Sequence, residues 1–316
     1  MKRALAVDIG GTKIAAALVT ADGEMSRRCE APTPADQGPQ AVLDAVAALA
    51  ADLISDESDG IAGVGIGTAG VVDACSGCIV SSTETISGWA GTDVRSGIHE
   101  RLGGDLAAVV VHNDVDAHAL GEAWLGAARA ASSVLMIAVG TGIGGAIIVG
   151  GRLWTGAHHA AGEIGHVPTP GAEGLRCPCS REGHLEALAS GASIARRYRT
   201  LAGVETNART VIERAEAGEP VALGIVRDAA IGLGHAIAGL VTTIDPACVV
   251  VGGGVAESGA VWWEPMRETC RADLIDALAA VPIVRAELGS SAALLGAARA
   301  AFDALDATRP GEGRAS

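Results

Sequence analysis

The chain has 316 residues, of which 49% are hydrophobic and 19% charged, so it has enough side chain to bury and is not a disordered or fibrous protein. Its 23 basic and 37 acidic residues give a net charge of −14, which argues against nucleic acid or an anionic membrane as a partner. Only 2% of the residues are aromatic, too few for a platform that stacks single-stranded nucleic acid. The length favours two domains or one two-lobed domain.

In the first half of the chain, short apolar runs alternate with turns and helical patterns, which is typical of an α/β fold. Strands are expected at residues 5–9, 14–19, 25–31, 61–66 and 107–111, and helices at 39–53 and 114–125. The second half gives strands at 134–139, 146–149 and 247–251, helices between 190 and 244, and a last helix at 291–305. The uncharged stretch 132–151 is long enough to span a membrane, but its central glycines divide it into two runs of strand length. Strand, glycine turn and strand thus occur twice, which indicates a duplicated fold.

The first glycine turn has the residues of a phosphate-binding loop. Gly10 and Gly11 would let a phosphate approach the backbone N–H groups closely. Thr12 can donate to a phosphate oxygen, Lys13 can neutralise its charge, and Asp8 can hold Mg²⁺ through water. No helix follows the turn, so it is neither a P-loop nor a Rossmann site, and an ordinary hairpin is the alternative.

Two further glycine segments suggest the rest of a nucleotide site. The turn 140–145 contains Thr141 and Gly142 and repeats the position of the first turn in the second half of the chain. The apolar strand 247–251 runs into Gly253 and Gly254, against which a flat base and ribose could lie. A buried strand that ends in glycines for purely structural reasons explains this second patch equally well.

Asn113 and Asp114 follow the strand 107–111 directly. Ligands of open α/β sheets bind beyond the carboxyl ends of strands, and a carboxylate there can take the proton of a hydroxyl that attacks a phosphoryl group. The alternative is that Asp114 only caps the following helix. The residues alone do not decide between the two.

Between residues 163 and 186 the periodic pattern stops, and metal-binding side chains collect. His166, Cys177, Cys179 and His184 offer four ligands of the kind that suits a closed tetrahedral Zn²⁺ site. Such an ion would order a loop that lacks regular structure. The alternative is a pair of free thiols beside two surface histidines. The seven cysteines and the absence of an export signal at the start of the sequence favour the reducing cytoplasm.

Taken together, these motifs resemble the ROK family of bacterial sugar kinases, within the actin/hexokinase superfamily. The matching segments are residues 8–13, 113–114 with 119–122, 140–145, 161–166 and 249–254. The resemblance implies a duplicated, actin/hexokinase-like (ribonuclease H-like) α/β fold of two lobes with a zinc-stapled loop. The expected parts are a first lobe at 1–115 with helix 291–306 packed on it, a second lobe at 116–290 with the loop 163–186, and a disordered tail at 307–316.

The resemblance also implies roles for particular residues. Asp114 would be the catalytic base for the sugar's 6-hydroxyl, and the sugar hydroxyls would be bound by Asn113, Glu163, His166 and Glu186. ATP with Mg²⁺ would be bound by Asp8, Gly10, Gly11, Thr12, Lys13, Thr141, Gly142, Gly253 and Gly254. Zn²⁺ would be held by His166, Cys177, Cys179 and His184, where the family usually has a third cysteine in place of His184.

Glucose is the substrate that the resemblance implies first, and N-acetylmannosamine or N-acetylglucosamine is the alternative. Thr85 stands where ROK glucokinases often carry asparagine, and residues 184–187 look more like those of N-acetylmannosamine kinases. The alternative hypothesis from another functional class is a sugar-sensing ROK regulator without a DNA-binding domain. The chain begins at its first phosphate loop, so we expect no helix-turn-helix, and its acidity disfavours polyphosphate. We expect a cytoplasmic homodimer or homotetramer.

Overall fold

The computed structural model describes residues 2–55, 60–83, 85–103 and 106–308. The chain forms two compact units, Met1–Arg129 with Gly156–Ala160 and Ser290–Ser316, and Ala130–Thr155 with Ala161–Gly289. We expected the first lobe to end at residue 115, but the division lies after Arg129, because helix α3 (Asp114–Trp124) packs on helix α9 (Ala292–Thr308). Most of the tail expected at 307–316 lies outside the described residues.

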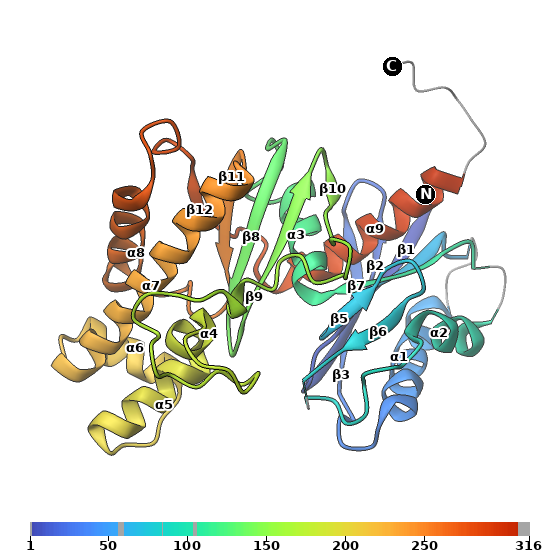
Figure 1. Cartoon of the computed structure of the whole chain (residues 1–316). Coiled ribbons are helices and arrows are strands. Elements are labelled where there is room, and N and C mark those ends of the chain that lie inside the picture. Colours follow the sequence, from blue (N-terminus) through green and yellow to red (C-terminus); the bar gives the residue numbers. More distant parts are fainter. Residues whose placement is uncertain (1, 56–59, 84, 104–105, 309–316) are drawn as a thin grey trace. The chain divides into compact units, whose positions relative to one another are not determined.

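Each unit is built on a five-stranded mixed sheet, and the two sheets have the same topology (Figure 1). The first sheet has the order β3-β2-β1-β4-β7 and the second the order β10-β9-β8-β11-β12. In each sheet, the first three strands along the chain pair antiparallel with one another, β1–β2–β3 and β8–β9–β10. The other two strands extend the sheet in parallel from the first strand, as β1–β4–β7 and β8–β11–β12. This is the duplication that the repeated strand–turn–strand pattern predicts. The strands are β1 (Arg3–Ile9), β2 (Lys13–Thr20), β3 (Met25–Pro32), β4 (Gly63–Thr68), β7 (Val109–Asn113), β8 (Ser133–Val139), β9 (Ile143–Val149), β10 (Arg152–Leu153), β11 (Cys248–Gly252) and β12 (Ile283–Arg285).

The remaining elements pack on these sheets or on one another. In the first unit they are α1 (Pro39–Ile54), the hairpin β5 (Val71–Asp73) and β6 (Cys78–Ser81), α2 (Val94–Leu102), α3 and α9. In the second they are η1 (Ile164–His166), α4 (Leu185–Ala189), α5 (Gly191–Ala202), α6 (Ala208–Glu216), α7 (Pro220–Ile244) and α8 (Ala260–Asp273). Within the described ranges, α7 alone is long and apolar enough to span a membrane. It packs against α8, α6 and α4, and its buried face belongs to the core of the second unit.

Glycines let α3, α9 and β4 approach one another closely. A Cβ atom at Gly296 would lie 1.7 Å from the carbonyl oxygen of Ala117, and one at Gly65 would lie 1.8 Å from that of Ala297. We expected β4 at 61–66, but the strand runs from Gly63 to Thr68. Its glycines make it a poor strand by propensity, yet they are what allows helices to lie directly on its backbone.

We expect Gly296→Ala to lower the free energy of unfolding by about 1–3 kcal/mol, because the added methyl group would overlap the backbone of α3. Gly239→Ala in α7 is the matched control, since that glycine is exposed, and a Cβ atom added there would have no other atom within 4 Å. The control should gain about 0.5–1 kcal/mol from helix propensity. Urea unfolding measures both changes, and equal stability of the two variants would contradict the packing argument.

Candidate active site

The first glycine turn, between β1 and β2, is held by hydrogen bonds to the backbone of Gly10. The N–H of Gly10 donates to the carbonyl of Lys13 at 3.0 Å, and the hydroxyl of Thr33 donates to the carbonyl of Gly10 at 2.6 Å. A Cβ atom at Gly11 would lie 2.0 Å from the side chain of Thr85, so this position has no room for a larger residue. The turn is therefore a fixed loop whose shape depends on glycine.

Two polar side chains of this turn reach solvent. Thr12 and Lys13 are both exposed, and the Nζ atom of Lys13 lies 2.9 Å from a carboxylate oxygen of Glu30. An exposed ion pair of this kind contributes little stability and is easily exchanged for another anion. Both side chains are thus available to a phosphate group.

Asp8, near the end of β1, and Asp114, directly after β7, lie close enough for their charges to interact. Burial raises the pKa of Asp8 to about 6, the charge of Asp114 adds to this, and Lys13 and Arg28 oppose it. A Cβ atom at Gly67 would lie 3.9 Å from Oδ1 of Asp8 and 3.8 Å from Cα of Asp114, so this glycine keeps the space beside the pair open. Two neighbouring, partly buried carboxylates fit a hard divalent cation such as Mg²⁺.

The residue that caps α3 is Asn113. Its Oδ1 accepts hydrogen bonds from the backbone N–H groups of Val115 at 2.8 Å and Asp116 at 3.3 Å, and its Nδ2 donates to the carbonyl of Gly70 at 2.9 Å. Asp114 is the first residue of the helix. The N-cap is therefore Asn113 and not Asp114, although Oδ1 of Asp114 also accepts from the N–H of Val115 at 2.9 Å. Asn113 has a structural role beside the sugar contact expected of it.

The second glycine turn lies between β8 and β9 and is shorter than expected. The N–H of Gly140 donates to the carbonyl of Gly142 at 2.9 Å, and β9 already begins at Ile143. We expected the turn to include residue 145, but Gly145 lies within the strand. Glycine is needed there because a Cβ atom would lie 3.0 Å from the carbonyl oxygen of Gly162.

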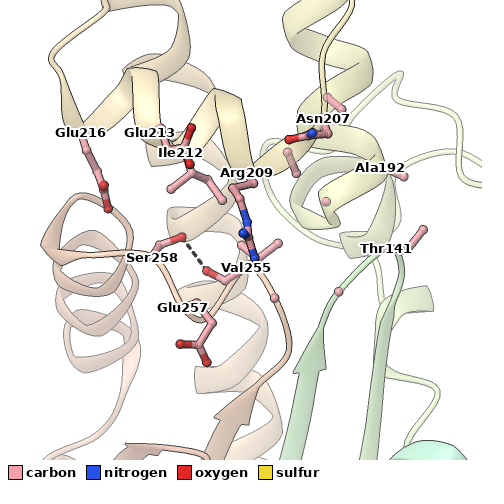
Figure 2. A pocket seen from close by; sticks show the side chains of 15 residues that line it. Thr141, Ala192, Asn207, Arg209, Ile212, Glu213, Glu216, Val255, Glu257 and Ser258 are labelled. Carbon is pink, nitrogen blue, oxygen red and sulfur yellow. Dashed lines mark hydrogen bonds between the residues drawn. The ribbon is translucent and has the colours of Figure 1, made fainter. Parts of the chain in front are cut away.

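A cavity of about 970 Å³ opens beside this turn, entirely within the second unit (Figure 2). Thr141 and Gly254, both expected to bind the nucleotide, line it. Gly142 and Gly253 are not among the lining residues. Gly253 has a φ of +90°, and a Cβ atom there would lie 2.5 Å from the carbonyl oxygen of Val139, so it shapes the turn after β11. The cavity is large enough for a nucleoside.

Helix α6 forms one wall of the cavity, and this wall was not predicted from the sequence. Figure 2 shows this wall opposite the turn that carries Val255 and Ser258. Its polar members are Asn207, Arg209, Glu213 and Glu216. Charged residues at this spacing look like any solvated helix face, so periodicity gave no signal for them. The N-cap Asn207, which accepts from the N–H of Thr210 at 2.9 Å, marks only where the helix begins.

The turn after β11 is held from behind by a stacked tryptophan. Nε1 of Trp263 donates to the carbonyl of Ala256 at 2.9 Å, and Arg285 donates to that of Ser258 at 2.7 Å. The guanidinium groups of Arg267 and Arg285 each lie 4.6 Å from the centre of the Trp263 ring. This buried stack fixes one wall of the cavity.

The four expected metal ligands come together in the second unit. One ligand atom from each of His166, Cys177, Cys179 and His184 lies within 4.8 Å of the other three. Sγ of Cys177 is 3.6 Å from Nδ1 of His166, and Sγ of Cys179 is 3.2 Å from Nδ1 of His184. Ligands of tetrahedral zinc lie about 3.3–3.8 Å apart, given bonds of about 2.0–2.3 Å, so the donor set fits Zn²⁺.

Two carboxylates stand beside this Cys/His cluster, by which we mean the four residues just named. Nε2 of His166 lies 3.7 Å from Oε2 of Glu163, so the ring turns one nitrogen to the cysteines and the other to this carboxylate. Burial raises the pKa of Glu163; His166 lowers it, and Glu186 raises it further. Oε2 of Glu186 accepts a hydrogen bond from the N–H of Ile143 at 2.8 Å. The expected sugar ligands Glu163, His166 and Glu186 thus lie in one unit, and Asn113 and Asp114 in the other.

Comparisons with known proteins agree on the family of this chain. The model of the ROK family matches residues 4–303. A glucokinase of Halalkalibacterium halodurans is 33% identical over 310 residues, which cover 92% of each chain, and an N-acetylmannosamine kinase of Escherichia coli is 36% identical over 79% of this chain and 82% of its own. The crystal structure of a ROK family glucokinase from Streptomyces griseus, in complex with glucose and AMPPNP, is 32% identical with a TM-score of 0.78, over 95% of this chain and 99% of that one. The chain belongs to the ROK family.

Proposed function

We propose that this chain, an ATP-dependent sugar kinase of the ROK family, transfers the γ-phosphoryl group of ATP to the 6-hydroxyl of a hexose, with glucose as the first candidate. The observation that carries the proposal is the pair of neighbouring carboxylates, Asp8 and Asp114, at the ends of two strands, β1 and β7, that both run parallel to β4. A kinase of this kind needs one carboxylate to accept a proton and another to hold the metal of the nucleotide.

Asp114 is the proposed general base. It accepts the proton of the sugar's 6-hydroxyl while that oxygen bonds to the γ-phosphorus and the bond from phosphorus to the bridging oxygen of ADP breaks. Asp8 would hold Mg²⁺ through water, and that ion, when bound, neutralises charge on the β- and γ-phosphates. Thr12 and Lys13 reach solvent beside this pair and would bind phosphate oxygens.

The second unit supplies the proposed contacts to both substrates. The cavity beside Thr141 and Gly254 would hold the adenosine part of ATP. Glu163 and Glu186 would accept hydrogen bonds from sugar hydroxyls, the N–H at Nε2 of His166 would donate one, and Asn113 of the first unit is the further proposed sugar ligand. A zinc ion in the Cys/His cluster would order the loop that carries Glu163 and Glu186, without taking part in the transfer.

Asp8 makes the free protein's stability depend on pH in a particular direction. Its folded pKa of about 6 lies above the ordinary 3.8, so the folded state binds the proton more tightly, and stability falls as pH rises from about 4 to 6. Asp8→Asn should therefore raise the free energy of unfolding at pH 7.5 by up to about 3 kcal/mol, with a smaller gain at pH 5. The same variant should lose Mg²⁺-dependent turnover.

Urea unfolding in the presence of EDTA measures this change. Asp22→Asn is the control of opposite sign, because the hydroxyl of Thr20 holds the pKa of that exposed carboxylate below its ordinary value. The control should lose stability at neutral pH and lose nothing at low pH. A D8N variant that is less stable than the wild type at pH 7.5 would contradict the raised pKa of Asp8, which comes mainly from burial and secondly from the charge of Asp114.

N-acetylmannosamine is the second candidate substrate. The N-acetylmannosamine kinase of E. coli is more similar in identity than the glucokinase, although over less of the chain. Thr85, which stands where ROK glucokinases often carry asparagine, packs against Gly11 in the first glycine turn. The sequence at 184–187 favours the same alternative.

A panel of sugars decides between the candidates. ADP formation is measured with glucose, mannose, fructose, allose, N-acetylglucosamine and N-acetylmannosamine, and kcat/KM is compared. Our proposal predicts the highest value for glucose, and the alternative predicts it for an N-acetyl sugar. Sugar binding without ADP formation by any member would instead support a sugar-sensing regulator.

We also propose a cytoplasmic location and a homodimer or homotetramer. None of the seven cysteines, all of which lie in the described residues, forms a disulfide, which supports a reducing compartment. Light scattering on the purified chain measures the assembly, and a monomer at micromolar concentration would contradict it.

A further inference from the structure

Residues 186–192, which follow the Cys/His cluster in the chain, are hydrogen-bonded to the second glycine turn. His184, a candidate metal ligand, is the N-cap of α4, and Glu186 lies two residues later. Oε2 of Glu186 accepts from the N–H of Ile143, the residue that follows the turn, at 2.8 Å. A side chain at Gly142 would collide with this carboxylate, since its Cβ atom would lie 2.7 Å from Oε2. The carboxylate thus fills the space behind the turn.

The same segment also holds the turn through its backbone. The N–H of Gly191 donates to the carbonyl of Gly140 at 2.8 Å, and the N–H of Ala192 donates to the carbonyl of Thr141 at 3.2 Å. The hydroxyl of Ser193 donates to the carbonyl of Glu186 at 2.7 Å, which ties the start of α5 to Glu186. Three hydrogen bonds between residues 186–192 and residues 140–143 therefore hold the turn that lines the cavity.

We propose that Glu186 is a positioning residue that couples the Cys/His cluster to the second glycine turn, so that a metal ion in the cluster strengthens nucleotide binding and does not act on the sugar side alone. The inference rests on the proposed function for the identity of the nucleotide. Its physical basis is that the ion fixes His184, His184 fixes the start of α4, and Glu186 transmits this position to Ile143. Couplings of this kind between sites change affinity by about 5–150-fold.

Two readouts without sugar test the coupling. One is the affinity for Mg²⁺-ADP by calorimetry, and the other is hydrogen exchange at residues 140–146. In the zinc-loaded protein, Glu186→Ala should weaken ADP binding by about tenfold or more and speed exchange at Ile143, with the metal content unchanged. Glu186→Gln keeps an acceptor oxygen for the Ile143 N–H and should restore most of the protection.

Glu163→Ala is the matched control, because this carboxylate also faces the cluster but has no hydrogen bond to the turn among the interactions described. It should leave ADP affinity and exchange at the turn near wild-type values. Removing zinc with a chelator should reproduce the effect of Glu186→Ala in the wild type and add little in that variant, as expected for one shared pathway.

Two results would overturn the coupling. Either E186A binds Mg²⁺-ADP within about twofold of the wild type, or zinc removal weakens ADP binding as much in E186A as in the wild type. Failure of the proposed function is a separate result: the exchange measurement needs neither nucleotide nor sugar, so faster exchange at the turn in E186A and after zinc removal would stand even if no sugar were phosphorylated.

Discussion

Asp114→Asn is expected to lower kcat by about 10²–10⁴-fold, because the amide cannot accept the proton of the sugar's 6-hydroxyl. Asparagine has nearly the same shape as aspartate, and the N-cap of α3 is Asn113, so the fold should stay intact. Loss of the repulsion with Asp8 should not weaken sugar binding. Steady-state kinetics with the best sugar of the panel, and calorimetry of sugar binding, measure the two effects.

Asp93→Asn is the matched control for this prediction. Asp93 caps α2 of the same unit by accepting from the N–H of Ser96 at 2.9 Å, and asparagine caps a helix equally well. The control should keep wild-type kcat. If D114N also kept more than about a tenth of wild-type kcat, Asp114 would not be the base, since loss of a general base costs at least about a hundredfold.

Zinc removal is expected to abolish sugar binding before it unfolds the protein. One Zn²⁺ per chain should be retained by the purified protein, because four donor atoms already lie within 4.8 Å of one another. Residues 167–184 form turns and isolated bridges without a helix or strand, so the metal bonds would supply much of their order. His184→Ala should lose part of the zinc, and His166→Ala should lose both zinc and sugar affinity.

Elemental analysis of protein purified without added metal measures the zinc, and Cys75→Ser is the control for loss of a thiol. Cys75 is exposed in the turn of the β5–β6 hairpin, away from the cluster residues in sequence and in the other unit. This variant should retain one zinc ion. Full kinase activity with substoichiometric zinc would contradict the role of the ion in ordering the loop.

Much of the fold could be predicted from the sequence, because β1, β2, β8 and β9 are apolar runs of strand length on either side of glycine turns. β5, β6, β10 and β12 were missed because runs of two to four residues have no measurable period. β4 was placed two residues early because every second residue is glycine. The reason for those glycines is the approach of α9, a long-range contact that no local pattern records.

The types of residue in the candidate site could be predicted from the sequence, but the tertiary contacts between them could not. The Cys/His cluster follows from residue types alone, since few patterns other than a metal site collect these side chains. The wall of the cavity formed by α6 and the hydrogen bond from Ile143 to Glu186 could not be found, because they depend on tertiary packing. Gly142, expected to bind ATP, does not line the cavity and lies instead against the carboxylate of Glu186.

The central claim is that the chain transfers a phosphoryl group from ATP to the 6-hydroxyl of a hexose. The most direct test is phosphorus NMR of the products formed from Mg²⁺-ATP and each of the two leading sugars, glucose and N-acetylmannosamine. We predict one hexose 6-phosphate for each ADP formed, and almost no product with D114N. ADP that accumulates without a sugar phosphate, or a sugar phosphorylated at another position, would contradict the claim.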